Sequence, residues 1–174
     1  MKTPSKKSWG YIIPTLFLVG GALFLFLKTN VVMEKFISSG YKSHGYFSGG
    51  GDTSDGLDVQ ALRWHKHDGY ERLVFDIYRW RGVIAESTYQ KTNEVGAYQI
   101  GREVVNTTTI DGELSGYRAF SAKLPSVTKS RFIKDMEVYS DGYSSYLFAI
   151  HLKKEVSYKV FSLKNPARII IDIK

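Results

Sequence analysis

The sequence predicts an all-β fold, a small antiparallel β-sandwich of two pseudo-symmetric sheets, preceded by one transmembrane helix. Three observations predict it. Apolar and polar residues alternate from Leu57 onward, which is the period of a half-buried strand. An uncharged apolar run, residues 9–27, precedes this region, and one strand pattern occurs twice within it.

The uncharged run reads WGYIIPTLFLVGGALFLFL. At about 1.5 Å per residue, a helix over residues 9–27 spans about 28 Å, close to the hydrocarbon thickness of a bilayer. A cleaved signal peptide is the alternative. However, apolar residues 23–27 follow the small residues 20–22 directly and leave no polar cleavage region. We therefore expect an uncleaved transmembrane anchor.

The charges before the anchor indicate its orientation. Lys2, Lys6 and Lys7 occur there without an acidic residue, and the positive-inside rule keeps such a segment in the cytoplasm. We expect residues 1–8 to be a cytoplasmic tail. The rest of the chain after the anchor should lie on the extracytoplasmic side of the cell membrane, in the periplasm or at the cell wall.

The net charge of +7 is mostly a feature of this membrane region. Without the four lysines that flank the anchor, 20 basic residues stand against 17 acidic ones, and the two signs are interspersed. This distribution argues against a nucleic-acid partner. The chain contains no cysteine, which excludes disulfides, thiol catalysis and cysteine-bound zinc.

Residues 28–56 are expected to form a flexible tether. Gly and Ser supply about half of residues 37–56, and no hydrophobic period runs through them. A tether of this kind would let a domain at residues 57–174 move away from the membrane surface.

Strands are predicted from the period-two alternation, and turn signals separate them. The predicted strands lie near 57–64, 72–80, 95–101, 103–110, 117–123, 130–140, 145–153, 156–162 and 167–173. The turns are expected at His67-Asp68-Gly69, Asp111-Gly112, Ser140-Asp141-Gly142 and Lys164-Asn165-Pro166. In the first turn, Asp68 is suited to cap the backbone and Gly69 to adopt a positive φ.

The repeated pattern is ERLVFDI at 71–77 and ARIIIDI at 167–173. Two matching strands at opposite ends of a domain suggest two pseudo-equivalent sheets that face each other. Alternation turns the arginine and the aspartate of each copy away from the apolar side. These residues are Arg72 and Asp76 in the first copy and Arg168 and Asp172 in the second.

Each arginine and aspartate within one copy are about 13 Å apart, too far to pair. If the two strands are neighbours or related by pseudo-symmetry, cross-strand ion pairs such as Arg72–Asp172 become possible. The alternative is that an arginine binds ligand carboxylates by bidentate hydrogen bonds.

Two segments carry a family resemblance. HDGYERLVFDI (67–77) and YKVFSLKNPARIIIDIK (158–174) resemble the opening and closing strands of AMIN and AMIN-like domains. The resemblance covers roughly 57–174 and is loose over 81–130. It implies two three-stranded sheets with internal pseudo-symmetry and a place outside the cytoplasmic membrane of bacteria. It also implies that the domain binds peptidoglycan or localises a partner, without being an enzyme.

Neither metal chemistry nor catalysis is expected. His65 and His67 share a strand face with Cβ atoms about 7 Å apart, which permits chelation. The only other histidines are His44 and His151, and no spacing points to a carboxylate that would complete a zinc site. No Gly-x-Ser-x-Gly elbow occurs, and Glu71 and Asp76 fall on opposite strand faces. We expect no catalytic residue, metal or cofactor.

Glycan recognition needs exposed aromatic faces beside hydrogen-bonding groups. The candidate ligand contacts in the sequence are Tyr70, Arg72, Tyr78, Trp80 and Arg168. The leading hypothesis is a membrane-anchored AMIN-like domain that binds peptidoglycan or another cell-wall polymer, or that localises envelope machinery. The alternative is a protein–protein interaction subunit of an envelope complex with no glycan contact.

Overall fold

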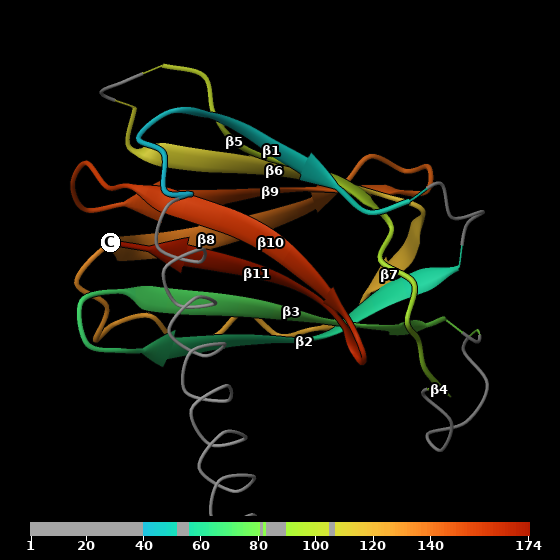
Figure 1. Cartoon of the computed structure of the whole chain (residues 1–174). Helices are drawn as coiled ribbons and strands as arrows, with labels where there is room; N and C mark the ends of the chain where they lie inside the picture. The colour runs from blue at the N-terminus through green and yellow to red at the C-terminus, as the bar shows by residue number, and fades with distance from the viewer. Residues whose placement is uncertain (1–39, 52–55, 81, 83–89, 105–106) are drawn as a thin grey trace, which may run out of the picture. The chain divides into compact units, whose positions relative to one another are not determined.

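The computed structural model describes residues 40–51, 56–80, 82, 90–104 and 107–174. Within these residues the chain forms two β-sheets that stack face to face (Figure 1). The tail and the anchor predicted at 1–8 and 9–27 lie outside the described residues. No helix among the described residues is long and apolar enough to cross a membrane.

The first sheet has five strands, and every neighbouring pair in it is antiparallel. Its strands, in spatial order, are β1 (Gly45–Gly49), β5 (Ala97–Arg102), β6 (Thr109–Ser115), β9 (Ser145–Leu152) and β8 (Ile133–Ser140). The order interleaves distant parts of the chain, so residues far apart in sequence share one surface.

The second sheet has six strands and is antiparallel except for one parallel pair, β2 with β7. Its strands, in spatial order, are β10 (Tyr158–Lys164), β11 (Ala167–Ile173), β3 (Glu71–Arg79), β2 (Leu57–Lys66) and β7 (Tyr117–Phe120), with β4 (Gln90–Lys91) paired to β3. The predicted all-β sandwich of two sheets is confirmed, although the sheets have five and six strands rather than three each.

The core lies between the two sheets and comes from the alternation predicted in the repeat. Leu73, Phe75 and Ile77 of β3 are buried, as are the three inward isoleucines of β11. The Phe75 ring lies 5.1 Å from the Phe148 ring of β9, so the sheets meet through aromatic packing. Removing these apolar faces from water is the main driving force for the sandwich.

The prediction that the two repeat strands lie in facing sheets is wrong. β3 and β11 are antiparallel neighbours in the six-stranded sheet, with Arg72 opposite Asp172 and Asp76 opposite Arg168. Both strands alternate apolar and polar residues in the same order. When they pair side by side, the apolar residues of both therefore lie on one face of the sheet and are buried there.

A second correction concerns the strand predicted at 103–110 and the turn at Asp111-Gly112. Strand β6 runs straight through both residues. A Cβ at Gly112 would lie 2.1 Å from the Phe148 ring. This glycine therefore makes room for a core phenylalanine, whereas Gly69 and Gly142 have the positive φ of true turns.

The prediction of a structureless tether is wrong for Gly45–Gly49, which form β1 at the edge of the five-stranded sheet. The glycines that suggested flexibility allow a close backbone approach here. A Cβ at Gly49 would lie 2.4 Å from the Tyr98 hydroxyl, and one at Gly101 would lie 2.2 Å from the Gly45 carbonyl oxygen. Phe47 of β1 packs against the core.

A buried arginine secures this added edge. Arg102 donates from Nη1 to the Thr107 carbonyl at 2.6 Å and from Nη2 to the Val156 carbonyl at 2.8 Å. Its Nε donates to the carbonyl of Ser43, just before β1. One buried guanidinium thus joins three separate chain segments. Among the described residues its hydrogen-bond acceptors are backbone carbonyl oxygens and not carboxylates.

Candidate functional site

The outer face of the six-stranded sheet carries the ligand contacts expected from the sequence. Arg72 donates from Nε and Nη2 to the two carboxylate oxygens of Asp172, at 2.6 and 2.8 Å. Asp172 is buried and Arg72 is about three-quarters buried. The guanidinium also lies 5.4 Å from the Tyr70 ring and 5.6 Å from the Phe161 ring. Its bidentate pairing raises the pKa of Arg72 and leaves it little capacity for a ligand carboxylate.

The second arginine of the repeat behaves differently. Asp76 accepts both hydrogen bonds from Arg63 on β2, at 2.6 and 2.8 Å, although Arg168 is its partner in the β-ladder. Arg168 donates to the Pro166 carbonyl at 3.3 Å. Of the four repeat charges, only Arg72 and Asp172 pair with each other.

The remaining expected contacts lie at the far end of the same strand. Measured along the strand at about 3.3 Å per residue, Tyr78 is about 20 Å and Trp80 about 26 Å from Arg72. Trp80 is exposed, and the Arg118 guanidinium lies 5.7 Å from its ring centroid. The residues predicted from the sequence therefore lie in or directly beside one sheet but do not converge on one site.

The histidines of the first turn also have local partners. The His67 ring stacks on the Tyr70 ring with centroids 4.6 Å apart and an interplanar angle of 8°. Among the described residues, neither His65 nor His67 belongs to a group of three converging metal donors.

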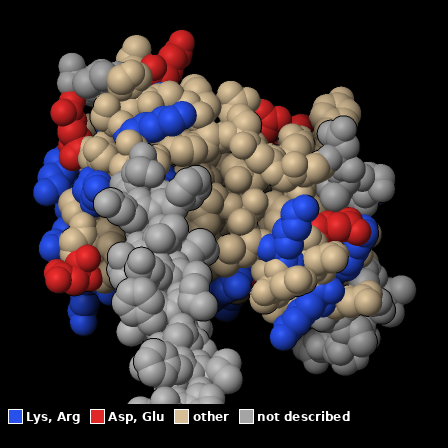
Figure 2. Space-filling view, in the orientation of Figure 1, with Lys and Arg blue, Asp and Glu red and all other residues tan. Residues whose placement is uncertain are grey.

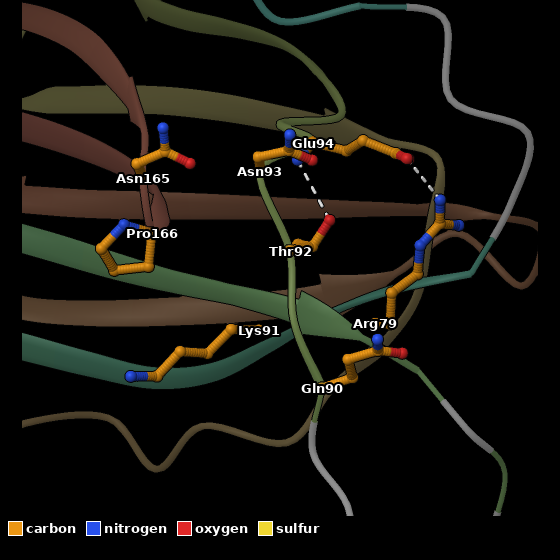
Figure 3. A pocket seen from close by; sticks show the side chains of 8 residues that line it. All are labelled: Arg79, Gln90, Lys91, Thr92, Asn93, Glu94, Asn165 and Pro166. Carbon is orange, nitrogen blue, oxygen red and sulfur yellow. Dashed lines mark hydrogen bonds and ion pairs between the residues drawn. The ribbon is translucent and has the colours of Figure 1, made fainter.

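A polar pocket, the turn pocket, lies where the β10–β11 turn approaches the segment after β4 (Figure 3). It has a volume of about 500 Å³ and is lined by Arg79, Gln90, Lys91, Thr92, Asn93, Glu94, Asn165 and Pro166. The Asn165–Pro166 peptide bond is cis.

Much of the turn pocket's polar capacity is used internally. Arg79 Nη2 donates to Glu94 Oε1 at 2.5 Å, and the Glu94 amide donates to Thr92 Oγ1 at 3.0 Å (Figure 3). No aromatic ring is among its lining residues. The turn pocket therefore lacks a stacking surface for a sugar.

A second hollow, the tyrosine groove, lies on the outer face of the five-stranded sheet. Its volume is about 430 Å³, and its lining comes from all five strands of that sheet. The lining residues are Tyr46, Gln99, Asp111, Gly112, Glu113, Tyr139, Leu147, Phe148 and Ala149.

The strand register explains how the tyrosine groove forms. Gln99, Glu113, Leu147 and Tyr139 are successive cross-strand partners and make one row. The next row contains Tyr46, Gly101, Asp111, Ala149 and Glu137 in the same way. The small residues in this second row leave a hollow between the tyrosines of β1 and β8.

The groove combines apolar walls with hydrogen-bond acceptors. Tyr46, Tyr139 and Leu147 are 38%, 52% and 44% exposed to solvent. Large apolar side chains that gather on a solvent-facing surface often mark a binding site. Asp111 and Glu113 supply carboxylates. Burial raises the pKa of Asp111, and the nearby His151 opposes that rise.

This arrangement suits a polyhydroxylated ligand. An aromatic ring offers a flat apolar surface on which the C–H face of a sugar can stack. Carboxylates accept hydrogen bonds from hydroxyl groups, and the Gln99 amide both donates and accepts. None of the residues that line the groove is among the ligand contacts predicted from the sequence. The available signal was the alternation over 136–152, which puts Tyr139 and Leu147 on the polar face.

Surface charge gives no competing site on the face shown in Figure 2. Lys and Arg side chains occur there in separate places, with Asp and Glu among them, and form no continuous basic patch.

The fold and the groove define the class: an all-β sandwich domain with an open, aromatic-walled hollow on one outer face. The family model of the AMIN-like domain matches residues 57–174. The chain therefore belongs to the AMIN-like domain family, as the two strand motifs indicated. No curated protein and no solved structure matches the chain.

Proposed function

We propose that this protein is a membrane-anchored, extracytoplasmic module that binds the glycan of the cell wall through the tyrosine groove. Its family supports a cell-wall-associated role. The observation that carries the proposal is the pair of exposed tyrosines on either side of carboxylate and amide groups. In this proposal the anchor at 9–27 holds the protein at the membrane, and the domain binds without turnover.

The chemistry of peptidoglycan fits the groove in two ways. Its sugars present C–H faces for Tyr46 and Tyr139 and acetamido groups for the Gln99 amide. Free amino groups on its stem peptides are complementary to Asp111 and Glu113. The volume of about 430 Å³ is within the range of small-ligand sites, about 300–1,000 Å³.

The test is cosedimentation of the full chain with purified peptidoglycan sacculi. The full chain should pellet with the sacculi, and Tyr46→Ala and Tyr139→Ala should each weaken binding by about tenfold, the effect of losing a central aromatic contact. The matched control is Tyr143→Ala. Tyr143 is 86% exposed and lies outside the groove, so its loss should leave binding unchanged.

Equal loss for all three tyrosine variants would contradict a role for the groove. No enrichment of the full chain in the pellet would contradict wall binding altogether. In that event, crosslinking in cells that traps a protein partner even after wall digestion would support the interaction-subunit alternative.

A further inference from the structure

We propose that Asp135, Glu137 and His151 form a binding site for a divalent transition-metal cation, with Zn²⁺ as the preferred ion. The three side chains lie on neighbouring strands β8 and β9, at one edge of the tyrosine groove. All three proposed ligands come from this chain, so the proposal does not rest on glycan binding by the tyrosine groove.

The donor atoms already converge. His151 Nε2 lies 3.2 Å from Glu137 Oε1 and 3.8 Å from Asp135 Oδ1, and the three donor atoms are all within 4.8 Å of one another. Ligand atoms in a tetrahedral zinc site with bonds of about 2.0–2.1 Å are about 3.3 Å apart. Only small side-chain movements separate the observed arrangement from a coordinated one.

A β-bulge creates this convergence. Ile133 and Met136 of β8 are both buried, and the register with β9 shifts between Ile133 and Asp135. In a regular strand Asp135 would share the inward face of Ile133. The extra residue turns Asp135 outward, directly opposite His151 and on the same side as Glu137.

The imidazole also has an outer partner. Thr109 Oγ1 lies 3.3 Å from His151 Nδ1, whereas the two carboxylates face the other ring nitrogen, Nε2. Such a contact orients the ring so that Nε2 is the metal-facing nitrogen. Lys134 Nζ lies 4.0 Å from an Asp135 oxygen, at the limit of an ion pair, so a cation would be the stronger counter-charge.

The donor types select the metal. An imidazole nitrogen favours Zn²⁺ over the hard cations Mg²⁺ and Ca²⁺, and two carboxylates are compatible with Zn²⁺ or Mn²⁺. All three side chains are partly exposed. Water or an oxygen atom of a bound molecule can therefore complete the coordination shell.

The experiment is Zn²⁺ binding to the full chain in the absence of glycan, measured by isothermal titration calorimetry and by elemental analysis after dialysis. We expect one Zn²⁺ per chain that depends on the three side chains. His151→Gln should weaken its binding at least 100-fold, and Asp135→Asn and Glu137→Gln should weaken it at least tenfold each. Thr109→Val should weaken it about tenfold through the outer partner.

The matched control is His65→Gln, which removes an exposed histidine from β2 in the other sheet and should leave Zn²⁺ binding unchanged. Uptake of less than one equivalent by the full chain would overturn the proposal. Equal affinity in the full chain and His151→Gln would also overturn it. Because no sugar is present, these outcomes are separate from failure of the tyrosine groove to bind glycan.

Discussion

At the scale of single residues, burial separates two ion pairs that have the same geometry. Arg72–Asp172 and Arg63–Asp76 are both bidentate and have the same distances, 2.6 and 2.8 Å. Asp172 is 1% exposed, whereas Asp76 is 16% exposed and its partner arginine 45%. The buried pair should therefore matter more for stability, since a carboxylate left alone there cannot be hydrated.

We predict that Arg72→Ala lowers the free energy of unfolding by about 3 kcal/mol, because it leaves Asp172 buried without its counter-charge. Arg63→Ala, the matched control, should lower it by less than about 1 kcal/mol. Urea denaturation at pH 7 measures both. Equal losses in the two variants would mean that burial does not distinguish the pairs.

Tyr41 gives a prediction for alkaline pH. Burial, and secondly the charge of Asp172, raise its pKa to about 12 from the usual 10. Between pH 10 and 12 the unfolded chain loses this proton while the folded chain keeps it. The contribution of Tyr41 to the free energy of unfolding is thus fully present below pH 10 and is lost as the pH rises towards 12.

In Tyr41→Phe the fall in stability between pH 9 and pH 11 should be smaller than in the unmodified chain. Tyr143→Phe, which changes an exposed tyrosine, should leave the fall as it is. Urea midpoints at the two pH values give the comparison. If stability falls as much in Tyr41→Phe as in the unmodified chain, Tyr41 is not the source of this pH dependence.

At the scale of secondary-structure elements, glycines mark the places where strands touch neighbouring groups closely. We predict that Gly112→Ala lowers the free energy of unfolding by about 2 kcal/mol, because a new Cβ would lie 2.1 Å from the buried Phe148 ring. Gly51→Ala is the control. Its Cβ would meet no atom within 4 Å, and the change should be within about 0.5 kcal/mol. Similar stabilities of the two variants, by urea denaturation, would contradict the packing role.

The same glycines explain which elements could be predicted from the sequence. Strands such as β3 and β11 alternate apolar and polar residues, and their faces were predicted correctly. β1 and β6 were not predicted, because Gly45, Gly49 and Gly112 resemble tether and turn residues. Their role depends on neighbours in other strands, and no local pattern reports it.

The candidate site was missed for a related reason. Tyr46 and Tyr139 are 93 positions apart in the sequence, and they reach one groove only through the register of five strands. Alternation shows which side chains face outward, but it does not show which strands are neighbours. The ligand contacts predicted from the sequence lie on or beside the six-stranded sheet, whereas the proposed groove lies on the five-stranded sheet.

At the scale of the whole molecule, the two outer faces carry different groups. The six-stranded face carries the family motifs, but its central arginine is occupied by Asp172. The five-stranded face carries exposed aromatics, acceptors and the histidine–carboxylate group. We propose that the outer face of the six-stranded sheet stabilises the domain and that the outer face of the five-stranded sheet binds the ligand.

The most direct test is chemical-shift mapping of the ¹⁵N-labelled full chain with a soluble disaccharide–peptide fragment of peptidoglycan. If the groove binds, the signals of Gln99, Glu113 and Leu147 should shift, with little change around Arg72 and Arg168. Shifts confined to Tyr70, Arg72 and Arg168, with the groove signals unmoved, would contradict binding by the groove.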